Sequence, residues 1–472
     1  MALPTPEGKQ KEVLCLPELG HFVVLGTAGS GKTTLAIHRS AYLAKLTDSD
    51  KKVLLVTFNK SLVTYLRAIS DGALLNIDVH NYHRFARGYL SSVGMLGRWG
   101  DIVDKGYKKT RLIEQAIQIV KEETGGNTTL SRAPEVFYEE ICWMQKMGIA
   151  TLEDYIDAER IGRAGTRITR AQRKYFFYVY ERYLEIREEK GYKYDWDDIA
   201  QAVKEEMAQD DSDRMYQHIV IDEGQDLSPV MLQSLALAVP DNGSITFFGD
   251  VAQQIYGGRI SWRNAGLKVK KDEIWRFEQN YRNSKEIADL AIAISKLPCF
   301  KQDADLVVPK QPTASGPKPV LIEFQNEQQE LGWIIQNAIA LAENETVAIL
   351  IRTREHVNSI INTLWGEGIR AQELHGDMNG WDNSPGVSVG TFHSAKGLEF
   401  DSVMVPYCNA DRMPSPDKIA ALEDRDEALS EEVKLIYVAV TRARRRLVIS
   451  YAGALTELIP QDDLLFNRHK PE

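Results

Sequence analysis

A glycine-rich segment near the start of the chain has the residue types that bind phosphate groups. Gly26-Thr-Ala-Gly-Ser-Gly-Lys32-Thr33 follows a short apolar run and precedes a stretch with helical spacing. Glycines let backbone N–H groups turn inward around phosphate oxygens, and the positive end of the helix dipole adds to the attraction. In such a loop Lys32 reaches the β and γ phosphates, and the Thr33 hydroxyl coordinates Mg²⁺. The alternative is a glycine-rich turn that matches this pattern by chance.

Two carboxylates at the end of another apolar run supply a partner for this loop. Asp222 and Glu223 follow the run from Gln217 to Ile221. Open parallel sheets present their ligands at the carboxyl ends of strands. Asp222 is therefore a candidate for holding Mg²⁺, and Glu223 for accepting a proton from an attacking water. A lone Asp-Glu pair at this place would more often be a helix cap, but beside a phosphate loop the hydrolytic interpretation is favoured.

Short apolar runs alternate with helical stretches and must position these residues. The first set of expected strands is 21–25, 52–58, 217–221 and 244–248. A second set, at 320–324, 347–352, 387–391, 402–405 and 446–450, follows a loop at 311–319. Within the first set, between Gly97 and Gln201, the segments 110–124, 134–147 and 169–190 are expected to be helical without buried strands. The pattern predicts an α/β protein with two parallel-sheet domains and an inserted helical domain.

Composition excludes several classes of protein. The 472 residues carry 57 basic and 67 acidic side chains, so the net charge of -10 argues against a surface coated in positive charge. Cys15, Cys142, Cys299 and Cys408 are widely spaced with no CxxC pair. We therefore expect no zinc site or disulfide framework, and a cytoplasmic protein. Neither a signal peptide nor an apolar run of about 18–20 residues is evident, so no membrane association is expected.

Further segments occur in the order of a known motif series. They are Val56–Lys60, Asn81–His83, Tyr194–Ile199, Asp222–Asp226, Phe248–Tyr256, Gln279–Arg282, Gly390–Phe400 and Tyr437–Ala443. Together with the phosphate loop, they resemble the motifs of superfamily 1 helicases of the UvrD, Rep and PcrA type. The resemblance spans Gln10 to Ala443, and Lys396-Gly397 favours this branch over the 5′-to-3′ branches.

The resemblance implies an ATP site, with Mg²⁺, between two RecA-like domains. In it Gln10 would read adenine, Tyr281 would stack on it, Glu399 would touch the ribose and Gln253 would sense the γ phosphate. Arg282 and Arg442 would be arginine fingers, for which a surface ion pair is the alternative. The implied catalytic residues are Lys32, Glu223, Gln253, Arg282 and Arg442. The implied nucleotide-binding residues are Gln10, Gly26, Thr27, Ala28, Gly29, Ser30, Gly31, Lys32, Thr33, Thr34, Tyr281 and Glu399, with Thr33 and Asp222 at the metal.

The resemblance also implies a track for single-stranded nucleic acid, gripped by phosphate contacts and by base stacking on aromatic rings. The candidates by motif position are Phe58, Asn59, Lys60, Tyr82, His83, Tyr256, Arg259 and His393. For Phe58 and Tyr82, a core position is an equal alternative. A basic series could add a phosphate-binding stripe or form an ordinary solvated face: Arg160, Arg163, Arg167, Arg170, Arg173 and Lys174. The neighbouring aromatics Tyr175, Phe176, Phe177, Tyr178 and Tyr180 are expected in the core.

In the terms of that family, the expected division is a first RecA-like domain (1A) at 1–97 and 201–275, a helical insertion (1B) at 98–200, and a second RecA-like domain (2A) at 276–472. The segment from Arg282 to Thr391 leaves room only for the second sheet domain, without the helical subdomain 2B of full-length relatives. The resemblance implies an ATP-dependent single-stranded DNA translocase or helicase with 3′-to-5′ polarity. Two alternatives are an ATPase subunit that regulates a partner nuclease in anti-phage defence, with little unwinding by itself, and a nucleotide switch without nucleic acid. No motif reads the 2′-hydroxyl, so RNA stays open as the track.

Overall fold

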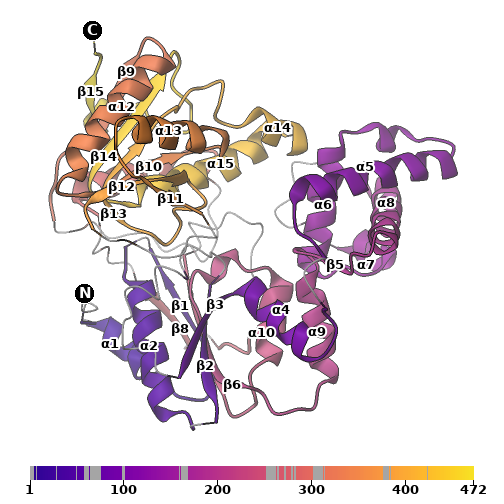
Figure 1. Cartoon of the computed structure of the whole chain (residues 1–472). Helices are drawn as coiled ribbons and strands as arrows, with labels where there is room; N and C mark the ends of the chain where they lie inside the picture. The colour runs from indigo at the N-terminus through magenta and orange to yellow at the C-terminus, as the bar shows by residue number, and fades with distance from the viewer. Residues whose placement is uncertain are drawn as a thin grey trace.

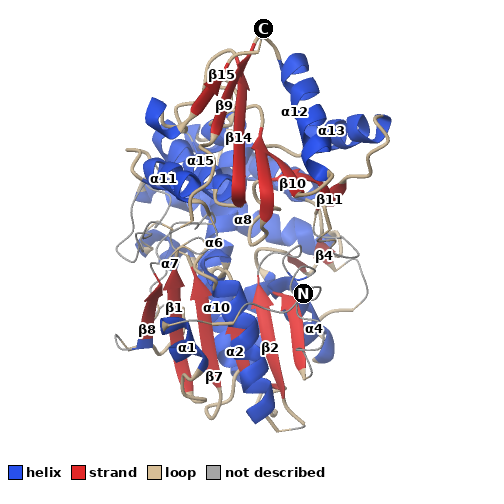
Figure 2. Cartoon of the chain, turned by 90° about the vertical axis from the view of Figure 1, so that its left-hand side faces the viewer, coloured by secondary structure: helices blue, strands red, loops and turns tan. Residues whose placement is uncertain are grey.

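Two parallel sheets, one above the other in Figure 1, form the body of the molecule. The computed structural model describes residues 5–6, 8–27, 29–48, 50–57, 63, 76–97, 101–158, 160, 168–250, 262, 265–270, 273–277, 280, 283–300, 312, 314–375, 382, 384–422 and 424–471. Every strand pair within the two large sheets is parallel, and helices lie on both faces of each sheet (Figure 2). The predicted α/β class with two RecA-like domains is confirmed.

The first sheet carries helices on both faces. Its strand order is β3 (Ile77–Asn81), β2 (Lys52–Thr57), β6 (Tyr216–Ile221), β7 (Ser244–Gly249), β1 (Gly20–Gly26) and β8 (Ile274–Phe277). Its helices are α1 (Lys9–Leu14), α2 (Lys32–Leu46), α4 (Tyr82–Ser92), α9 (Ile199–Gln209) and α10 (Pro229–Leu237). Successive strand residues point to opposite faces. Val23 and Leu25 therefore join the core under α4, α9 and α10, while Val24 joins the core under α1 and α2.

The second sheet follows the same plan. Its strand order is β11 (Gln372–Leu374), β12 (Gly386–Thr391), β10 (Thr346–Ile351), β13 (Phe400–Val405), β14 (Ala443–Ala452), β9 (Val320–Phe324) and β15 (Asn467–His469). Its helices are α11 (Lys285–Ser295), α12 (Glu327–Ala342), α13 (Glu355–Gly366), α14 (Pro416–Leu422) and α15 (Arg425–Val440). Within the described parts of 283–391, each helix and strand belongs to this sheet or packs on it. The division into 1A, 1B and 2A without a 2B subdomain stays a prediction.

The helical insertion lies beside the first sheet domain (Figure 1). It contains α5 (Gly106–Glu123), α6 (Pro134–Met147), α7 (Leu152–Asp157) and α8 (Arg170–Glu189), and a short pair of strands, β4 (Ile102–Val103) and β5 (Tyr194–Asp195). Phe176, Phe177 and Tyr180 are buried in its own core, as predicted, whereas Tyr178 on the same helix is exposed.

The basic series of this insertion does not form the continuous exposed face that either alternative, a phosphate-binding stripe or a solvated face, requires. Arg160 forms an ion pair with the fully buried Glu140 at 2.6 Å. Arg173 is buried and donates from Nη1 to the carbonyls of Tyr155 and Ile156, at the end of α7. Both arginines are therefore structural. Arg170 and Lys174 are exposed, and Arg163 and Arg167 lie outside the described residues.

A buried ionic cluster joins α5, α6 and α8 of the insertion to the turn at β5, which leads into α9 of the first sheet domain. Asp195 is 1% exposed and accepts from Tyr183 Oη at 2.6 Å and from Gln145 Nε2 at 2.9 Å. Lys109 Nζ lies 3.2 Å from Asp195 and 2.8 Å from Asp197. Three helices, α5, α6 and α8, thus attach to one turn. We call the group Lys109, Lys146, Arg187, Asp195, Asp197 and Asp198 the joint cluster.

The insertion also touches the second sheet domain. Helix α14 packs on α6, and Lys418 Nζ lies 3.5 Å from Glu139 on α6 and 2.9 Å from Glu431 on α15. In Figure 1, α14 extends from the second domain toward the insertion. The insertion therefore contacts both sheet domains, because α6 also packs on α10 of the first. Among the helices that the structure describes, none has the length and apolarity for a bilayer crossing.

Candidate functional site

The phosphate loop connects β1 to α2 and is tightly wound. Lys32 Nζ donates to the carbonyls of Gly26 at 2.9 Å and Thr27 at 2.7 Å, so the side chain folds back over its own loop. Gly31 has a φ of 81°, a left-handed conformation that favours glycine. A Cβ at Gly26 would lie 2.4 Å from Ser30 Oγ. Only glycine fits at this position, as the sequence pattern predicts.

Buried polar atoms around this loop lack partners. Thr27 Oγ1, Ser30 Oγ and both carboxylate oxygens of Asp222 have no hydrogen bond of ordinary geometry within the described part of the chain. Each buried polar group in that condition costs about 1–3 kcal/mol, and such a group needs an explanation. Together they fit a phosphate-and-cation ligand: hydroxyls and N–H groups for phosphate, and a carboxylate for Mg²⁺.

The pair Asp222 and Glu223 lies directly beside the loop, and the two carboxyls have different environments. Burial, and then the neighbouring charge of Glu223, raise the pKa of Asp222, although the Thr33 hydroxyl is near enough to lower it. Burial also opposes ionisation of Glu223. The charges of Lys396, Lys32 and Arg442 outweigh that effect and lower the pKa of Glu223. An ionised Glu223 has the charge state that a general base requires.

Two of those three cations come from the second sheet domain. Lys396 follows β12, and its Nζ lies 2.5 Å from Asp226 Oδ1 on the turn after β6. Arg442 follows α15, is 1% exposed, and donates from Nε to the carbonyl of Val438 at 3.0 Å. The acidic residues of the Asp222–Asp226 segment, called motif II below, belong to the first domain. They therefore meet these cations of the second domain at one place.

A fully buried arginine holds Gln10 near the loop. Gln10 Nε2 donates to the carbonyl of Ser30 at 3.0 Å. It lies on α1, a six-residue helix that is too short to be stable alone. Arg39 on α2 donates to the carbonyls of Leu14, Leu16 and Pro17 at 2.7–3.0 Å, just after α1. The position of Gln10 thus depends on a helix that carries part of the phosphate loop.

Residues 7–277 match the family model described as the UvrD/REP helicase N-terminal domain, which is more than half of the chain. The chain belongs to the UvrD/REP helicase family. Residues 275–378 and 372–454 match the UvrD-like helicase C-terminal domain.

Curated relatives cover most of the chain at low identity. A probable DNA helicase of Mycoplasma pneumoniae is 23% identical, covering 90% of this chain and 80% of that protein. The ATP-dependent DNA helicase UvrD2 of Mycobacterium bovis is 23% identical, covering 94% and 78%. The ATP-dependent DNA helicase PcrA of Leuconostoc citreum is 24% identical, covering 75% of this chain and 48% of that protein.

Several predicted contacts of this UvrD/REP-family chain are not tested by the structure. Ala28, Phe58, Asn59, Lys60, Gln253, Tyr256, Arg259, Tyr281 and Arg282 lie outside the described residues. Glu399, the predicted ribose contact, forms an ion pair with Arg444 at 2.9 Å on the surface of the second domain. That pair leaves its proposed role open.

The predicted nucleic-acid contacts differ in how accessible they are. Tyr82 is fully buried, and its hydroxyl bonds to Ser234 Oγ at 2.6 Å. Its ring is a core element here and cannot stack on a base, so this assignment is corrected. His83 is partly exposed and contacts Trp196, with 3.1 Å from Nε2 to the Trp196 carbonyl. His393 is also partly exposed; burial, then Arg352, Lys396 and Lys418, lower its pKa to about 3, so it is neutral at neutral pH.

Four polar residues of the site were inside the quoted motifs but had no predicted role. Gln225 links Glu223 to the backbone of Asp250, Asp226 pairs with Lys396, and Asp250 lies 3.8 Å from Lys32. The number of charged residues in the motifs could have indicated Lys396. The segments Asp222–Asp226 and Phe248–Tyr256 supply four carboxylates near one lysine, Lys32, and buried charges require partners of opposite charge.

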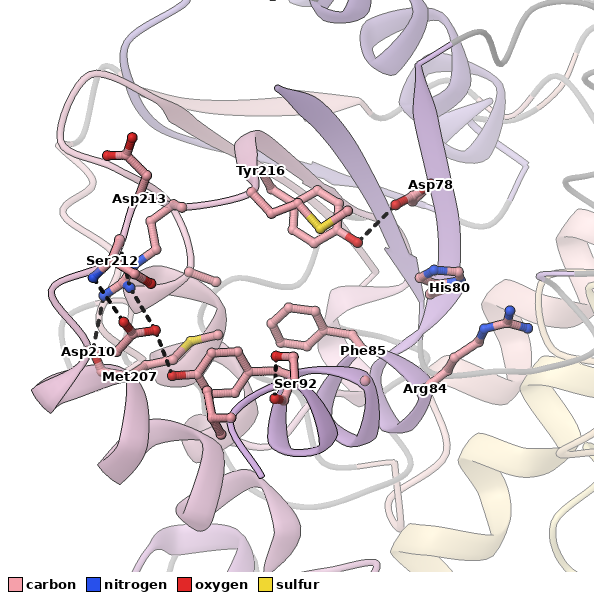
Figure 3. Close-up of a pocket in the computed structure, with 16 residues that line it drawn as sticks. Asp78, His80, Arg84, Phe85, Ser92, Met207, Asp210, Ser212, Asp213 and Tyr216 are labelled. Atoms are coloured by element: carbon pink, nitrogen blue, oxygen red, sulfur yellow. Dashed lines mark hydrogen bonds and ion pairs between the residues drawn. The ribbon is translucent and has the colours of Figure 1, made fainter. Parts of the chain in front are cut away.

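A separate cavity of about 610 Å³ opens at the opposite end of β3 and β6 (Figure 3). Aromatic side chains, including Phe85 and Tyr216, form its wall. Its polar groups bond to one another: Tyr216 to Asp78 at 3.0 Å and Tyr89 to Asp210 at 3.0 Å. These satisfied groups give no ligand preference, and the cavity is remote from the phosphate loop.

Proposed function

We propose that this chain is an ATP-dependent motor on single-stranded DNA that hydrolyses ATP between its two RecA-like domains and moves 3′ to 5′. The observation that supports this most directly is the convergence of Lys32, Lys396 and Arg442 on Glu223, because two of these cations belong to the other domain. A base that depends on both domains would link hydrolysis to their relative movement. The relatives named as DNA helicases support DNA as the track.

Each predicted residue of the ATP site has a proposed task. The N–H groups of the phosphate loop and Lys32 would bind the phosphates, and Glu223 would accept a proton from the attacking water. Arg442, with Arg282, would stabilise the charge of the transition state. Thr33 and Asp222 would hold Mg²⁺, which when bound neutralises charge on the phosphates. Gln10, Tyr281 and Glu399 would bind the nucleoside, and Gln253 would sense the γ phosphate.

The proposed track for the strand consists of His83 and His393, together with Phe58, Asn59, Lys60, Tyr256 and Arg259. His393 is neutral at neutral pH and His83 is hydrogen-bonded to the Trp196 carbonyl, so their contacts with the strand would be hydrogen bonds and stacking. The cytoplasm is the compartment that fits the free cysteines Cys15, Cys142, Cys299 and Cys408.

The test is ATP hydrolysis with and without single-stranded DNA, followed by strand displacement on 3′-tailed and 5′-tailed duplexes. We expect stimulation by DNA and activity only on the 3′-tailed duplex. Arg442→Ala should keep nucleotide binding but lose about 10³–10⁵ in turnover, and near-normal turnover would contradict its role. Stimulation by DNA without displacement on either duplex would instead favour a regulatory ATPase that needs a partner such as a nuclease. Equal stimulation by RNA would contradict DNA as the track.

A further inference from the structure

The contact between Lys396 and Asp226 is a buried ion pair between the two sheet domains. Lys396 Nζ lies 2.5 Å from Asp226 Oδ1, and the two side chains are 3% and 2% exposed. Lys396 stands in the turn between β12 and β13, and Asp226 in the short 3₁₀ turn at Gly224–Asp226. A buried charge without its partner is strongly unfavourable. The second domain therefore supplies a counter-charge that the first domain needs.

The turn that Lys396 contacts also carries Glu223, in an unusual backbone conformation. Glu223 has a φ of 52°, which is left-handed and rare for a residue with a side chain. The amide of Asp226 donates to the carbonyl of Glu223 at 3.0 Å, which closes the turn. On its inner side the turn is crowded, because a Cβ at Gly224 would lie 2.2 Å from the Phe247 ring. Such a conformation persists only where the surroundings hold it.

Asp226 and Glu223 are thus two ends of one rigid unit. Phe247 of β7 supports the unit from inside the first domain, and Gln225 Nε2 donates to Glu223 Oε2 at 2.5 Å. The side of the turn at Asp226 is fixed by Lys396 of the second domain. A movement of Lys396 relative to the first domain would therefore act on the turn that orients the carboxylate of Glu223.

We infer that Lys396 is a positioning residue for Glu223: by pairing with Asp226 across the domain boundary, it holds the motif II turn in the conformation that aims the Glu223 carboxylate. This inference rests on the proposed ATPase function. It assigns to Lys396 a task distinct from binding nucleotide, since its ammonium is engaged by Asp226. Correct geometry of Glu223 would then require the two domains to be in contact at this point.

The second contact between domains provides a matched control. Lys418 also forms an ion pair with the first part of the chain, to Glu139 at 3.5 Å, but its partner lies on α6 of the insertion. Lys418→Met removes a lysine and an interdomain ion pair without touching the motif II turn. Lys396→Met removes the same chemical group at the turn.

The experiment measures the kcat and KM of DNA-stimulated ATP hydrolysis, together with the Kd of a fluorescent ATP analogue and the melting temperature. It uses the full chain and the variants Lys396→Met, Asp226→Asn, the double variant and Lys418→Met. We expect Lys396→Met to lower kcat by about 10²-fold, the effect of a misplaced catalytic group, with the analogue bound as tightly as by the wild type. The double variant should lose no more than Lys396→Met alone, because both changes break one interaction.

Each result either supports or overturns the positioning role of Lys396. A wild-type kcat in Lys396→Met overturns the inference, and so does an equal loss in Lys418→Met, which would indicate general loosening of the domains. A loss of analogue binding in Lys396→Met, with the fold intact, also overturns it, because Lys396 would then be a nucleotide-binding residue. If Lys396→Met fails to fold, Lys396→Gln is measured by the same criteria. A wild-type chain that does not hydrolyse ATP with any nucleic acid would instead refute the proposed function itself.

Discussion

Gln225 donates a hydrogen bond from Nε2 to Oε2 of Glu223 at 2.5 Å, while its Oε1 accepts from the amide of Asp250 at 2.9 Å. One amide side chain thus joins the end of β6 to the end of β7. It keeps the proposed base at a fixed distance from Asp250, which lies 3.8 Å from Lys32.

Replacing Gln225 with leucine should lower kcat by roughly 10–10²-fold while KM for ATP changes little, because a loosened base loses its aim but the phosphate loop is intact. Steady-state hydrolysis at saturating DNA measures both constants. Gln201→Leu is the control, since the Gln201 side chain donates to Glu205 on α9 and makes no hydrogen bond to Glu223 or Asp250 within the part of the chain that the structure describes. A rise in KM without a fall in kcat would contradict the positioning role.

Replacing Arg39 with methionine should weaken ATP selection and stability together. The change leaves the carbonyls of Leu14, Leu16 and Pro17 without this donor, and the buried Leu16 carbonyl alone costs about 1–3 kcal/mol when unsatisfied. Helix α1 would then detach, and Gln10 with it. Urea unfolding and the ratio of kcat/KM for ATP and GTP are the measurements. Gln10→Ala should reduce that ratio without the loss of stability. An unchanged ratio in Arg39→Met would show that the position of α1 is not needed for recognition of the base.

Replacing Asp195 with asparagine should lower the free energy of unfolding by about 3–5 kcal/mol, because Lys109 and Arg187 lose a buried counter-charge. Hydrogen exchange should rise first in α5, α6 and α8, which meet at the joint cluster, and least in α2. Asp104→Asn is the surface comparison, since its pair with Lys108 is exposed and is worth at most about 1 kcal/mol. Equal effects of the two substitutions would show that the joint cluster is not needed to hold the insertion.

The stability of the first sheet domain should fall in weak acid through His218. Burial, and then the charge of Arg39, lower the pKa of His218 from 6.5 to about 4. The unfolded chain therefore takes up a proton near pH 6.5, while the folded chain does not until about pH 4. The stabilising contribution is complete above pH 6.5 and is lost as the pH falls toward 4. His218→Asn should unfold with a shallower pH dependence than the wild type between about pH 7 and about pH 5, as measured by urea unfolding; parallel curves would contradict the assignment.

Much of the architecture follows from sequence periodicity. The helix expected at 134–147 is α6 to the residue, and the strand expected at 217–221 is β6 with one residue added. Short apolar runs bounded by turn residues are typical of central strands in a covered parallel sheet, so their length and flanking residues indicate them. The phosphate loop was equally predictable, because Gly26 and Gly31 satisfy local steric demands that the sequence displays.

Contacts between distant segments were less predictable. Tyr82 lies in the Asn81–His83 segment, and from the sequence a core position and a nucleic-acid contact were equal alternatives. Only the position of Ser234 on α10 shows that the Tyr82 hydroxyl has a buried partner. Arg160 and Arg173 have the spacing of a basic stripe, but Glu140 and the carbonyl ends of α7 turn them inward. Helical spacing determines which face a residue occupies, and not which neighbour covers that face.

The insertion contacts both sheet domains through α6, which packs on α10 of the first and on α14 of the second, where Lys418 pairs with Glu139. Because the insertion contacts both sheet domains, it limits how the two domains can move apart. A parallel separation of the two sheet domains would have to break the α6–α14 contact as well as the Lys396–Asp226 pair. Strain from each catalytic cycle would then reach α6 first and, through Lys109 and Asp195, the turn that bears Trp196 and its neighbour His83.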